Sequence, residues 1–259
     1  MTSLYHYRRF IWQRAVAEVR HRYAGTSFGV VWNVLHPLAV IAIYSAVFSQ
    51  LMPARIPGVN NQFAHVLYLC SGILPWLAFS ECVTRGASAF LDNAMYLKKL
   101  PMPEQVFVAS TAASATLGLA ISFSLLLAVA LALGLRPNQY WLLLPIPLVL
   151  LQVLGFALGL LLGTLNVFFR DIGQFLVVSL QLVFWTVPVV YMTDQVPVPG
   201  WVFRWHPLYP PLNAIHDLFL FSRLPDKATC IGLVAWPAIF LSMGWLAFSR
   251  LRGEIRDLL

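Results

Sequence analysis

The stretch that decides the fold runs from Arg20 to Met52, RHRYAGTSFGVVWNVLHPLAVIAIYSAVFSQLM. Its first residues are basic, and they are followed by a flexible collar that contains the small residues Gly25, Thr26, Ser27 and Gly29. The 25 residues from Phe28 to Met52 include no charged side chain. At about 1.5 Å per helical residue, this run exceeds the roughly 30 Å hydrocarbon core of a bilayer. We therefore expect an interfacial segment that turns into a membrane-spanning helix.

The composition of the whole chain extends this theme. Of 259 residues, 59% are hydrophobic and 10% are charged, whereas a soluble domain has about 25% charged residues. We predict an all-α polytopic membrane protein, with residues 1–259 forming a single transmembrane domain. The net charge of +7 is typical of the cytoplasmic loops of membrane proteins, so we expect no nucleic-acid partner. Cysteine spacing suggests neither a metal site nor a disulfide.

Six transmembrane helices are predicted, each long enough to cross a bilayer. Their approximate limits are 28–52, 63–83, 106–134, 141–168, 172–193 and 229–249. Ahead of them, residues 1–27 form the interfacial segment. Apolar side chains from Ile11 to Tyr23 share one helical face, which predicts a basic amphipathic helix in the headgroup layer. The spacing of Glu18 and Arg22 favours a pair within this helix.

The distribution of basic residues predicts the orientation. Twelve of the 17 Lys and Arg side chains lie in the N-terminal segment, the 84–105 loop, the C-terminal tail or at Arg170. Basic loops stay in the cytoplasm, so both termini are expected there. The 194–228 loop then faces outside as a cap, in which residues 212–222 are too short to span and suit a re-entrant or interfacial helix.

Two spans carry small residues at every fourth position, a pattern that lets helix backbones approach closely. The third span has Ser110, Ser114, Gly118 and Ser122, and the fourth has Gly155, Gly159 and Gly163. We expect these stripes to pack on each other or on a second copy of the chain.

Several kinds of chemistry are missing from the sequence. It contains no GxxxxGK[ST] phosphate-binding loop, no HExxH and no GxSxG. Charged residues within the spans are sparse, with Glu81 near the end of the second, whereas ion-coupled carriers bury several such groups near the membrane midplane. The chain therefore has helices that could form a transport path across the membrane, but no evident site for ATP or a coupled ion to drive transport.

A family resemblance rests on five stretches in order along the chain. They are RYAGTSFGVVWNVLHPL at 22–38, YSAVFSQL at 44–51, LKKLPMP at 97–103, NVFFRD at 166–171 and WHPLYPPLNAIHDLFL at 205–220. Together they resemble the membrane (permease) subunit of type-2 ABC exporters of polysaccharides, which carry lipid-linked O-antigen, capsular polysaccharide or teichoic acid.

The resemblance implies a homodimer of permeases in the bacterial inner membrane, working with two copies of a separate cytoplasmic ATPase subunit. ATP and magnesium would be bound by that partner, and this chain would have no cofactor, metal or catalytic residue of its own. It would move a lipid-linked polysaccharide outward and contact membrane lipids.

The resemblance also implies roles for particular residues. The lipid-linked substrate would enter at Arg20, Arg22 and Tyr23, although plain contact of these arginines with anionic lipid is an equal alternative. Aromatic side chains expected to line the channel, because flat rings can stack on sugars, are Trp32, Tyr44, Phe48, Trp76, Phe79, Trp185 and Tyr191. Residues expected to dock on the ATPase are Tyr96, Leu97, Lys98, Lys99 and Leu100. Residues expected to fix the cytoplasmic end of the fourth and fifth spans are Asn166, Arg170 and Asp171.

Three alternatives stay open at this stage. A type-2 exporter of teichoic acid, drugs or simple lipids would share the architecture. A membrane enzyme acting on lipid-linked sugars would need carboxylates or histidines that converge at one depth, whereas the histidines are scattered in sequence. A membrane-anchored scaffold would bind a partner through the 84–105 loop without transporting anything.

Overall fold

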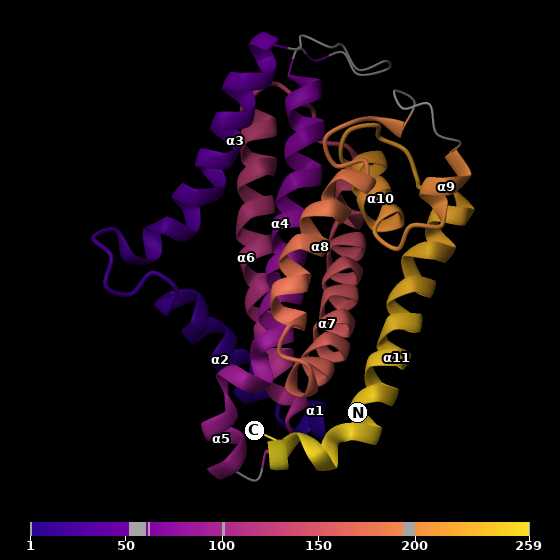
Figure 1. The fold of residues 1–259 in the computed structure, drawn as a ribbon. Helices are drawn as coiled ribbons and strands as arrows, with labels where there is room; N and C mark the ends of the chain where they lie inside the picture. The colour runs from indigo at the N-terminus through magenta and orange to yellow at the C-terminus, as the bar shows by residue number, and fades with distance from the viewer. Residues whose placement is uncertain (1, 52–60, 62, 100–101, 194–199, 259) are drawn as a thin grey trace.

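The computed structural model describes residues 2–51, 61, 63–99, 102–193 and 200–258, which form a bundle of helices without a strand in those ranges (Figure 1). The α-helices are α1 (Thr2–His6), α2 (Arg8–His21), α3 (Trp32–Leu51), α4 (Ala64–Asp92), α5 (Ala94–Lys99), α6 (Gln105–Ala132), α7 (Pro145–Phe168), α8 (Ile172–Thr186), α9 (Gly200–Arg204), α10 (Tyr209–Phe219) and α11 (Lys227–Leu258). Two 3₁₀ turns, η1 (Gly29–Val31) and η2 (Gln139–Leu143), precede α3 and α7.

The predicted all-α membrane fold is confirmed, but the count of six spans is not. In the described part of the chain, 5 helical segments are long and apolar enough to cross a membrane: η1 with α3, α4, α6, η2 with α7, and α11. The predicted fifth span, 172–193, corresponds to α8, which has 15 residues and ends at Thr186. The helix stops there because Pro188 favours an extended conformation in the residue before it, and Val187 is extended.

Helix α4 is the centre of the bundle. In its apolar stretch 83% of the residues are buried, whereas the corresponding shares are 11% in the first span and 22% in α11. Helix α4 packs mainly between α6 and α7. The helix does not stop at the predicted limit of 83 but continues to Asp92. The predicted 84–105 loop therefore begins as the end of α4, and α5 follows after a break at Asn93.

The small-residue stripe of α7 packs on α4 rather than on the stripe of α6, which was one of the two partners that we expected for it. A Cβ atom added to Gly163 would lie 2.7 Å from the carbonyl oxygen of Gly86. One added to Gly155 would lie 3.0 Å from Cys82 Sγ. Since real Cβ atoms do not approach a backbone atom at 2.7 Å, glycine at 163 is what allows the backbones of α4 and α7 to touch.

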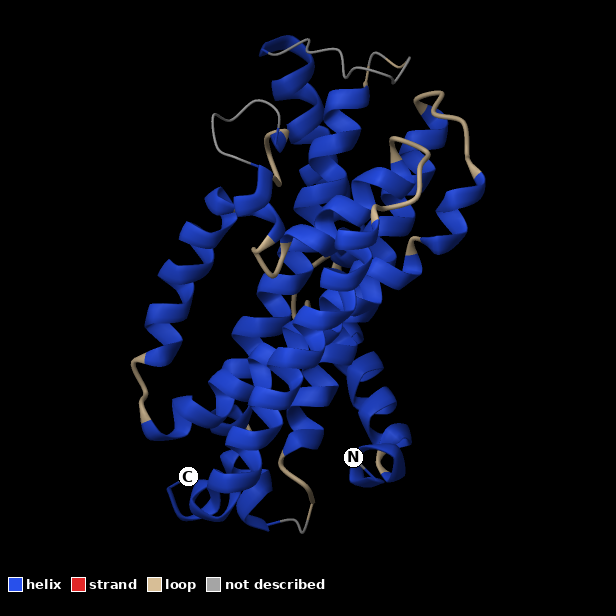
Figure 2. Cartoon of the chain, turned by 90° about the vertical axis from the view of Figure 1, so that its right-hand side faces the viewer, coloured by secondary structure: helices blue, strands red, loops and turns tan. Residues whose placement is uncertain are grey.

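The two ends of the bundle differ in what they carry. Both termini and α5 lie at one end, and α9 and α10 lie toward the other (Figures 1 and 2). At the first end, α2 packs on α6, and the lower part of α3 leans away from the bundle (Figure 1). The predicted N-terminal helix is broken at Tyr7, which separates α1 from α2.

The helix predicted at residues 212–222 corresponds to α10, which is embedded in the bundle. Nine of its 11 residues are buried, and it packs on α11, α4 and α7. The His216 ring stacks on Tyr68 of α4 with 4.0 Å between ring centroids. Trp141 Nε1 of η2 donates a hydrogen bond of 3.0 Å to the carbonyl oxygen of Phe219. Helix α10 is therefore part of the core at this end, and the role of the 194–228 segment as a cap stays a prediction.

Candidate functional site

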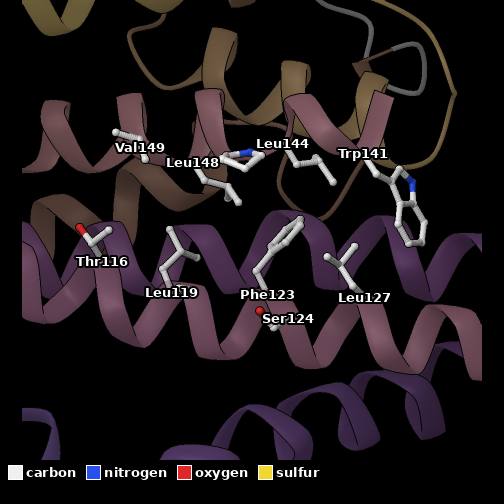
Figure 3. A pocket seen from close by; sticks show the side chains of 11 residues that line it. Thr116, Leu119, Phe123, Ser124, Leu127, Trp141, Leu144, Leu148 and Val149 are labelled. Atoms are coloured by element: carbon white, nitrogen blue, oxygen red, sulfur yellow. The ribbon is translucent and has the colours of Figure 1, made fainter. Parts of the chain in front are cut away.

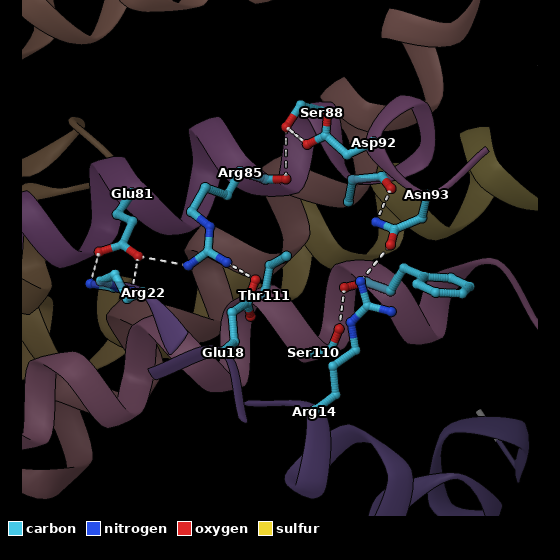
Figure 4. A network of polar contacts seen from close by, with 12 residues as sticks. Arg14, Glu18, Arg22, Glu81, Arg85, Ser88, Asp92, Asn93, Ser110 and Thr111 are labelled. Atoms are coloured by element: carbon cyan, nitrogen blue, oxygen red, sulfur yellow. Dashed lines mark hydrogen bonds and ion pairs between the residues drawn. The ribbon is translucent and has the colours of Figure 1, made fainter. Parts of the chain in front are cut away.

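A row of alternating charges joins α2 to α4 (Figure 4). Arg14, Glu18 and Arg22 are four residues apart along α2 and the residue after it, so they share one face. Glu81 and Arg85 occupy successive turns of α4. Arg22 pairs with Glu81, Arg85 also pairs with Glu81, and Arg85 pairs with Glu18. The pair that we expected between Glu18 and Arg22 is thus replaced by pairs across the two helices.

Arg22 binds Glu81 through both terminal nitrogens of its guanidinium group. Arg22 Nη1 donates to Glu81 Oε2 over 3.1 Å, while Nη2 donates to Oε1. Arg85 Nη1 donates to the same Oε1 over 2.8 Å. The side chains of Arg22 and Glu81 are 24% and 28% exposed. A two-bond contact of this kind fixes the orientation of the guanidinium as well as its charge.

Arg14 anchors the other end of α2. Its guanidinium donates to Asn93 Oδ1, at the break between α4 and α5, and lies 4.8 Å from the centroid of the Phe107 ring. Burial lowers the pKa of Arg14, but an arginine remains charged near neutral pH. Asn93 in turn donates to the carbonyl oxygen of Ala89 over 2.7 Å. The N-terminal segment is therefore fixed to α4 at two separate points.

A cavity of about 270 Å³ opens beside the Arg22–Glu81 pair. Its polar lining comes from Arg22, Tyr23, Asn33, His36, Glu81 and Ser122, and Trp32 lies among its other lining residues. Asn33 Nδ2 donates to the carbonyl oxygen of Val19 over 3.0 Å, which ties the start of α3 to α2. Gly118 leaves room for the arginine, since a Cβ atom there would lie 3.9 Å from Arg22 Nη1. We call this space the arginine cavity.

A second cavity of about 550 Å³ shares His36 and Leu77 with the first. Its aromatic lining consists of Tyr44, Trp76, Phe184 and Trp185, from α3, α4 and α8. Ser80 and Gln181 provide hydrogen-bonding groups beside these rings. We call it the aromatic cavity. Because the two cavities share two lining residues, a charged group in one and a sugar in the other would lie along the same wall.

The two predicted arginines are directed to different places. Arg22 and Tyr23 line the arginine cavity. Arg20 is exposed, and it lines a separate groove on α2 and α6 whose other members are Val16, Val19, Leu117, Ala120, Ile121, Ser124 and Leu125. Apolar walls with a cation at the edge suit the acyl chain and headgroup of an anionic lipid. Arg20 and Arg22 therefore lie in different surroundings, and both roles considered for these arginines stay predictions.

The structure brings four of the seven predicted channel aromatics to the two cavities: Trp32 to the first, and Tyr44, Trp76 and Trp185 to the second. Phe79 is 1% exposed in the core and lines neither. Tyr191 donates from its hydroxyl to the carbonyl oxygen of Trp185 over 3.1 Å, beside the aromatic cavity. The side chain of Phe48 lies outside the described residues.

The residues predicted to dock on an ATPase lie on α5. Tyr96 is 57% exposed, and Lys98 and Lys99 are exposed as well. Leu97 is 2% exposed and holds α5 to the bundle, and Leu100 lies outside the described residues. Two basic side chains and one aromatic side chain are thus exposed at the end that carries both termini.

Of the three residues predicted to fix the fourth and fifth spans, Asn166 makes the structural contact. It is buried in α7, and its Nδ2 donates to the carbonyl oxygen of Ala87 in α4 over 2.9 Å. Arg170 and Asp171 are exposed at the turn between α7 and α8.

Sequence reasoning did not assign a role to Glu81, Arg85 or His36. Two oppositely charged residues four apart in an otherwise apolar helix were the available signal for Glu81 and Arg85, since ionisable groups in a span are usually functional. Nothing in the sequence indicated a role for His36, which comes close to the other cavity residues because the chain turns between Gly25 and Gly29.

A cavity of about 230 Å³ lies between α6 and the start of α7 and has mainly apolar walls (Figure 3). No group of three or more His, Cys, Asp or Glu side chains that could hold a metal ion occurs in the described part of the chain. His36 lines the arginine cavity, whereas His216 is buried against Tyr68, so these two do not converge.

Comparison with known proteins gives matches along most of the chain. Residues 10–220 match the family model described as ABC-2 type transporter. A protein of Klebsiella pneumoniae named O-antigen export system permease protein RfbA is 27% identical over 244 residues, which cover 93% of this chain and 92% of that protein. A Myxococcus xanthus protein of the same name is 28% identical over 258 residues, which cover 98% and 97% of the two chains.

Proposed function

The chain belongs to the ABC-2 type transporter family, and we propose that it is the membrane subunit of an exporter that moves a lipid-linked polysaccharide out of the cell. The two relatives described above are named as permeases for O-antigen export and match nearly the full length of this chain. We accordingly favour O-antigen among the possible glycans, ahead of capsular polysaccharide and teichoic acid.

The observation that carries this proposal is the sharing of one wall by the arginine cavity and the aromatic cavity. A lipid-linked glycan joins an anionic phosphate to a chain of sugars. Arg22 offers two donors on one plane to a phosphate. Trp76 and Trp185 offer flat ring surfaces that suit sugar faces. The apolar groove beside Arg20 would lie against membrane lipid.

Energy for transport would come from a separate ATPase. Association with an ATPase subunit is implied by the family; we place two such subunits on α5 of two permease copies, with ATP and magnesium bound by the partner. The exposed Tyr96, Lys98 and Lys99 support this placement. In α8 only Leu176 is buried, which supports a second copy of the chain beside this helix. Both termini would face the cytoplasm of a bacterial inner membrane.

The other functions considered from the sequence receive less support. An exporter of drugs or simple lipids would not need an aromatic cavity beside the arginine cavity. An enzyme acting on lipid-linked sugars is less favoured because the relatives that match along nearly the whole chain are named as permeases.

The test is deletion of the gene for this chain in its own host. The proposal expects surface polysaccharide to disappear and its lipid-linked form to accumulate inside the cell. A plasmid copy of the chain should restore export, whereas a copy with Trp76→Ala and Trp185→Ala should restore little of it at equal abundance in the membrane. Normal surface polysaccharide in the deletion strain would rule the proposal out.

A further inference from the structure

Glu81 is shared between two arginines, and this arrangement has a chemical consequence. Its Oε1 accepts hydrogen bonds from both Arg22 and Arg85, and its Oε2 accepts one from Arg22. Arg85 is held in addition by Glu18. Two arginines and two glutamates are therefore linked in a row, and their charges sum to zero. Of these four, Arg22 and Glu81 line the arginine cavity.

Removing Arg22 from this set leaves no charge alone. Glu81 would keep Arg85 at 2.8 Å, one helical turn away, and Arg85 would keep Glu18. A partly buried carboxylate that loses its only partner is strongly destabilising, but here the second arginine prevents that loss. Arg22 can therefore change partners at low cost, provided that the new partner is also an anion.

The incoming anion is constrained by the shape of the guanidinium. Its fork binds carboxylate and phosphate oxygens with the same pair of parallel hydrogen bonds. A phosphate that binds the Nη1–Nη2 edge of the guanidinium would compete with Glu81, which occupies both of these donors. The tie between Arg22 and α4 would then open, while the bond of Arg14 to Asn93 and the pair between Glu18 and Arg85 remain.

We propose that Arg22 is an exchangeable ligand, held by Glu81 when the cavity is empty and taken over by the phosphate ester of a membrane lipid when that lipid arrives. This inference rests on the proposed function, since it takes the lipid carrier of the glycan as the natural source of the phosphate. It assigns Glu81 a positioning role: the carboxylate keeps the guanidinium aimed at the cavity and sets how tightly a phosphate must bind to displace it.

The experiment measures binding of farnesyl phosphate to the purified full-length chain by native mass spectrometry, with farnesol as the phosphate-free probe. Glu81→Gln removes the competing charge, so it should tighten farnesyl phosphate binding by about tenfold and leave farnesol binding unchanged. Arg22→Gln should abolish the preference for farnesyl phosphate over farnesol. The matched control is Glu18→Gln, which makes the same change of charge one turn away without touching Arg22 and should leave affinity as in the unmodified chain.

Two results would overturn the exchange. One is unchanged farnesyl phosphate affinity in Glu81→Gln, and the other is an equal gain in Glu18→Gln, which would mean that charge alone attracts the phosphate. Should Glu81→Gln not yield folded protein, Glu81→Asp keeps the charge with a shorter reach and should tighten binding in the same direction by a smaller factor.

A parallel titration with phosphatidylglycerol distinguishes the two sources of a lipid phosphate. Tighter phosphatidylglycerol binding in Glu81→Gln would support exchange with any phospholipid headgroup, and an effect confined to farnesyl phosphate would support exchange with the prenyl carrier. Failure of the exchange differs from failure of the proposed function, because the deletion strain tests export without reference to Glu81.

Discussion

Gly86 of α4 and Gly159 of α7 meet backbone to backbone: a Cβ atom on Gly86 would lie 2.8 Å from the Cα atom of Gly159. No side chain of either helix separates the two at this point. Because α4 also carries Glu81 and Trp76, this contact sets where the walls of both cavities stand relative to α7.

We expect Gly163→Ala to separate α4 from α7, since the added methyl group would lie 2.7 Å from the carbonyl oxygen of Gly86. Overpacking of this kind costs about 1–3 kcal/mol. Thermal unfolding of the purified chain in detergent should therefore begin at a lower temperature. Gly253→Ala is the matched control, because a Cβ atom there meets nothing within 4 Å. Equal midpoints for the two variants would contradict the contact.

The two N-terminal arginines should respond differently to replacement by lysine. Arg22→Lys keeps the charge but loses the two-bond fork, so we expect export to fall by about tenfold at unchanged abundance. Arg20→Lys should export normally, because attraction to anionic lipid does not distinguish the two side chains. Export is measured as surface polysaccharide in a complemented deletion strain. Equal defects in both variants would argue against separate roles.

Reversal of the charges on α5 should weaken the complex with the ATPase. Lys98 and Lys99 are exposed, so their joint replacement by glutamate should leave the permease inserted and reduce co-purification of the partner by about tenfold. Lys227→Glu reverses an exposed charge at the start of α11 and serves as the control. Unchanged co-purification in the double variant would make α5 a connector only.

The predicted orientation places Asp226 outside the cell and Asp92 inside. Both side chains are exposed, so a cysteine at either position is accessible from its own side of the membrane. In a background with Cys230→Ser, an impermeant maleimide added to intact cells should label Asp226→Cys and spare Asp92→Cys. Cys70 and Cys82 are buried and should not react. Labelling at 92 before the cells are broken would reverse the topology.

Helix identity was predictable from the sequence because long uncharged runs have few alternatives in a bilayer. The limits of α4 and α8 were not. The positively charged loop between the second and third spans hid the fact that α4 continues through Arg85 to Asp92. At the other end, Pro188 shortened a span that hydropathy alone would have continued.

The site was predictable in its residue types and not in its pairing. Arg22 and Tyr23 could be placed near a phosphate because they end a basic amphipathic segment. Glu81, the partner of Arg22, lies 59 positions away, and the contact depends on how α2 crosses α6. Hydrophobic periodicity contains no information on that crossing. The same limit applies to His36, whose place in both cavities follows from the angle at which α3 leaves the collar.

The length and position of α4 allow this one helix to connect distant parts of the molecule. Its 29 residues, Ala64–Asp92, extend about 43 Å. Along this length lie Tyr68, which stacks on His216, and Glu81 in the arginine cavity, before the break at Asn93. Pro75 interrupts its hydrogen bonding within the upper half, where a rod of this kind bends most easily. Between Pro75 and Asp92 the helix is unbroken, so we expect a displacement of α5 to move the wall of the arginine cavity at Glu81, whereas Tyr68 lies beyond the bend.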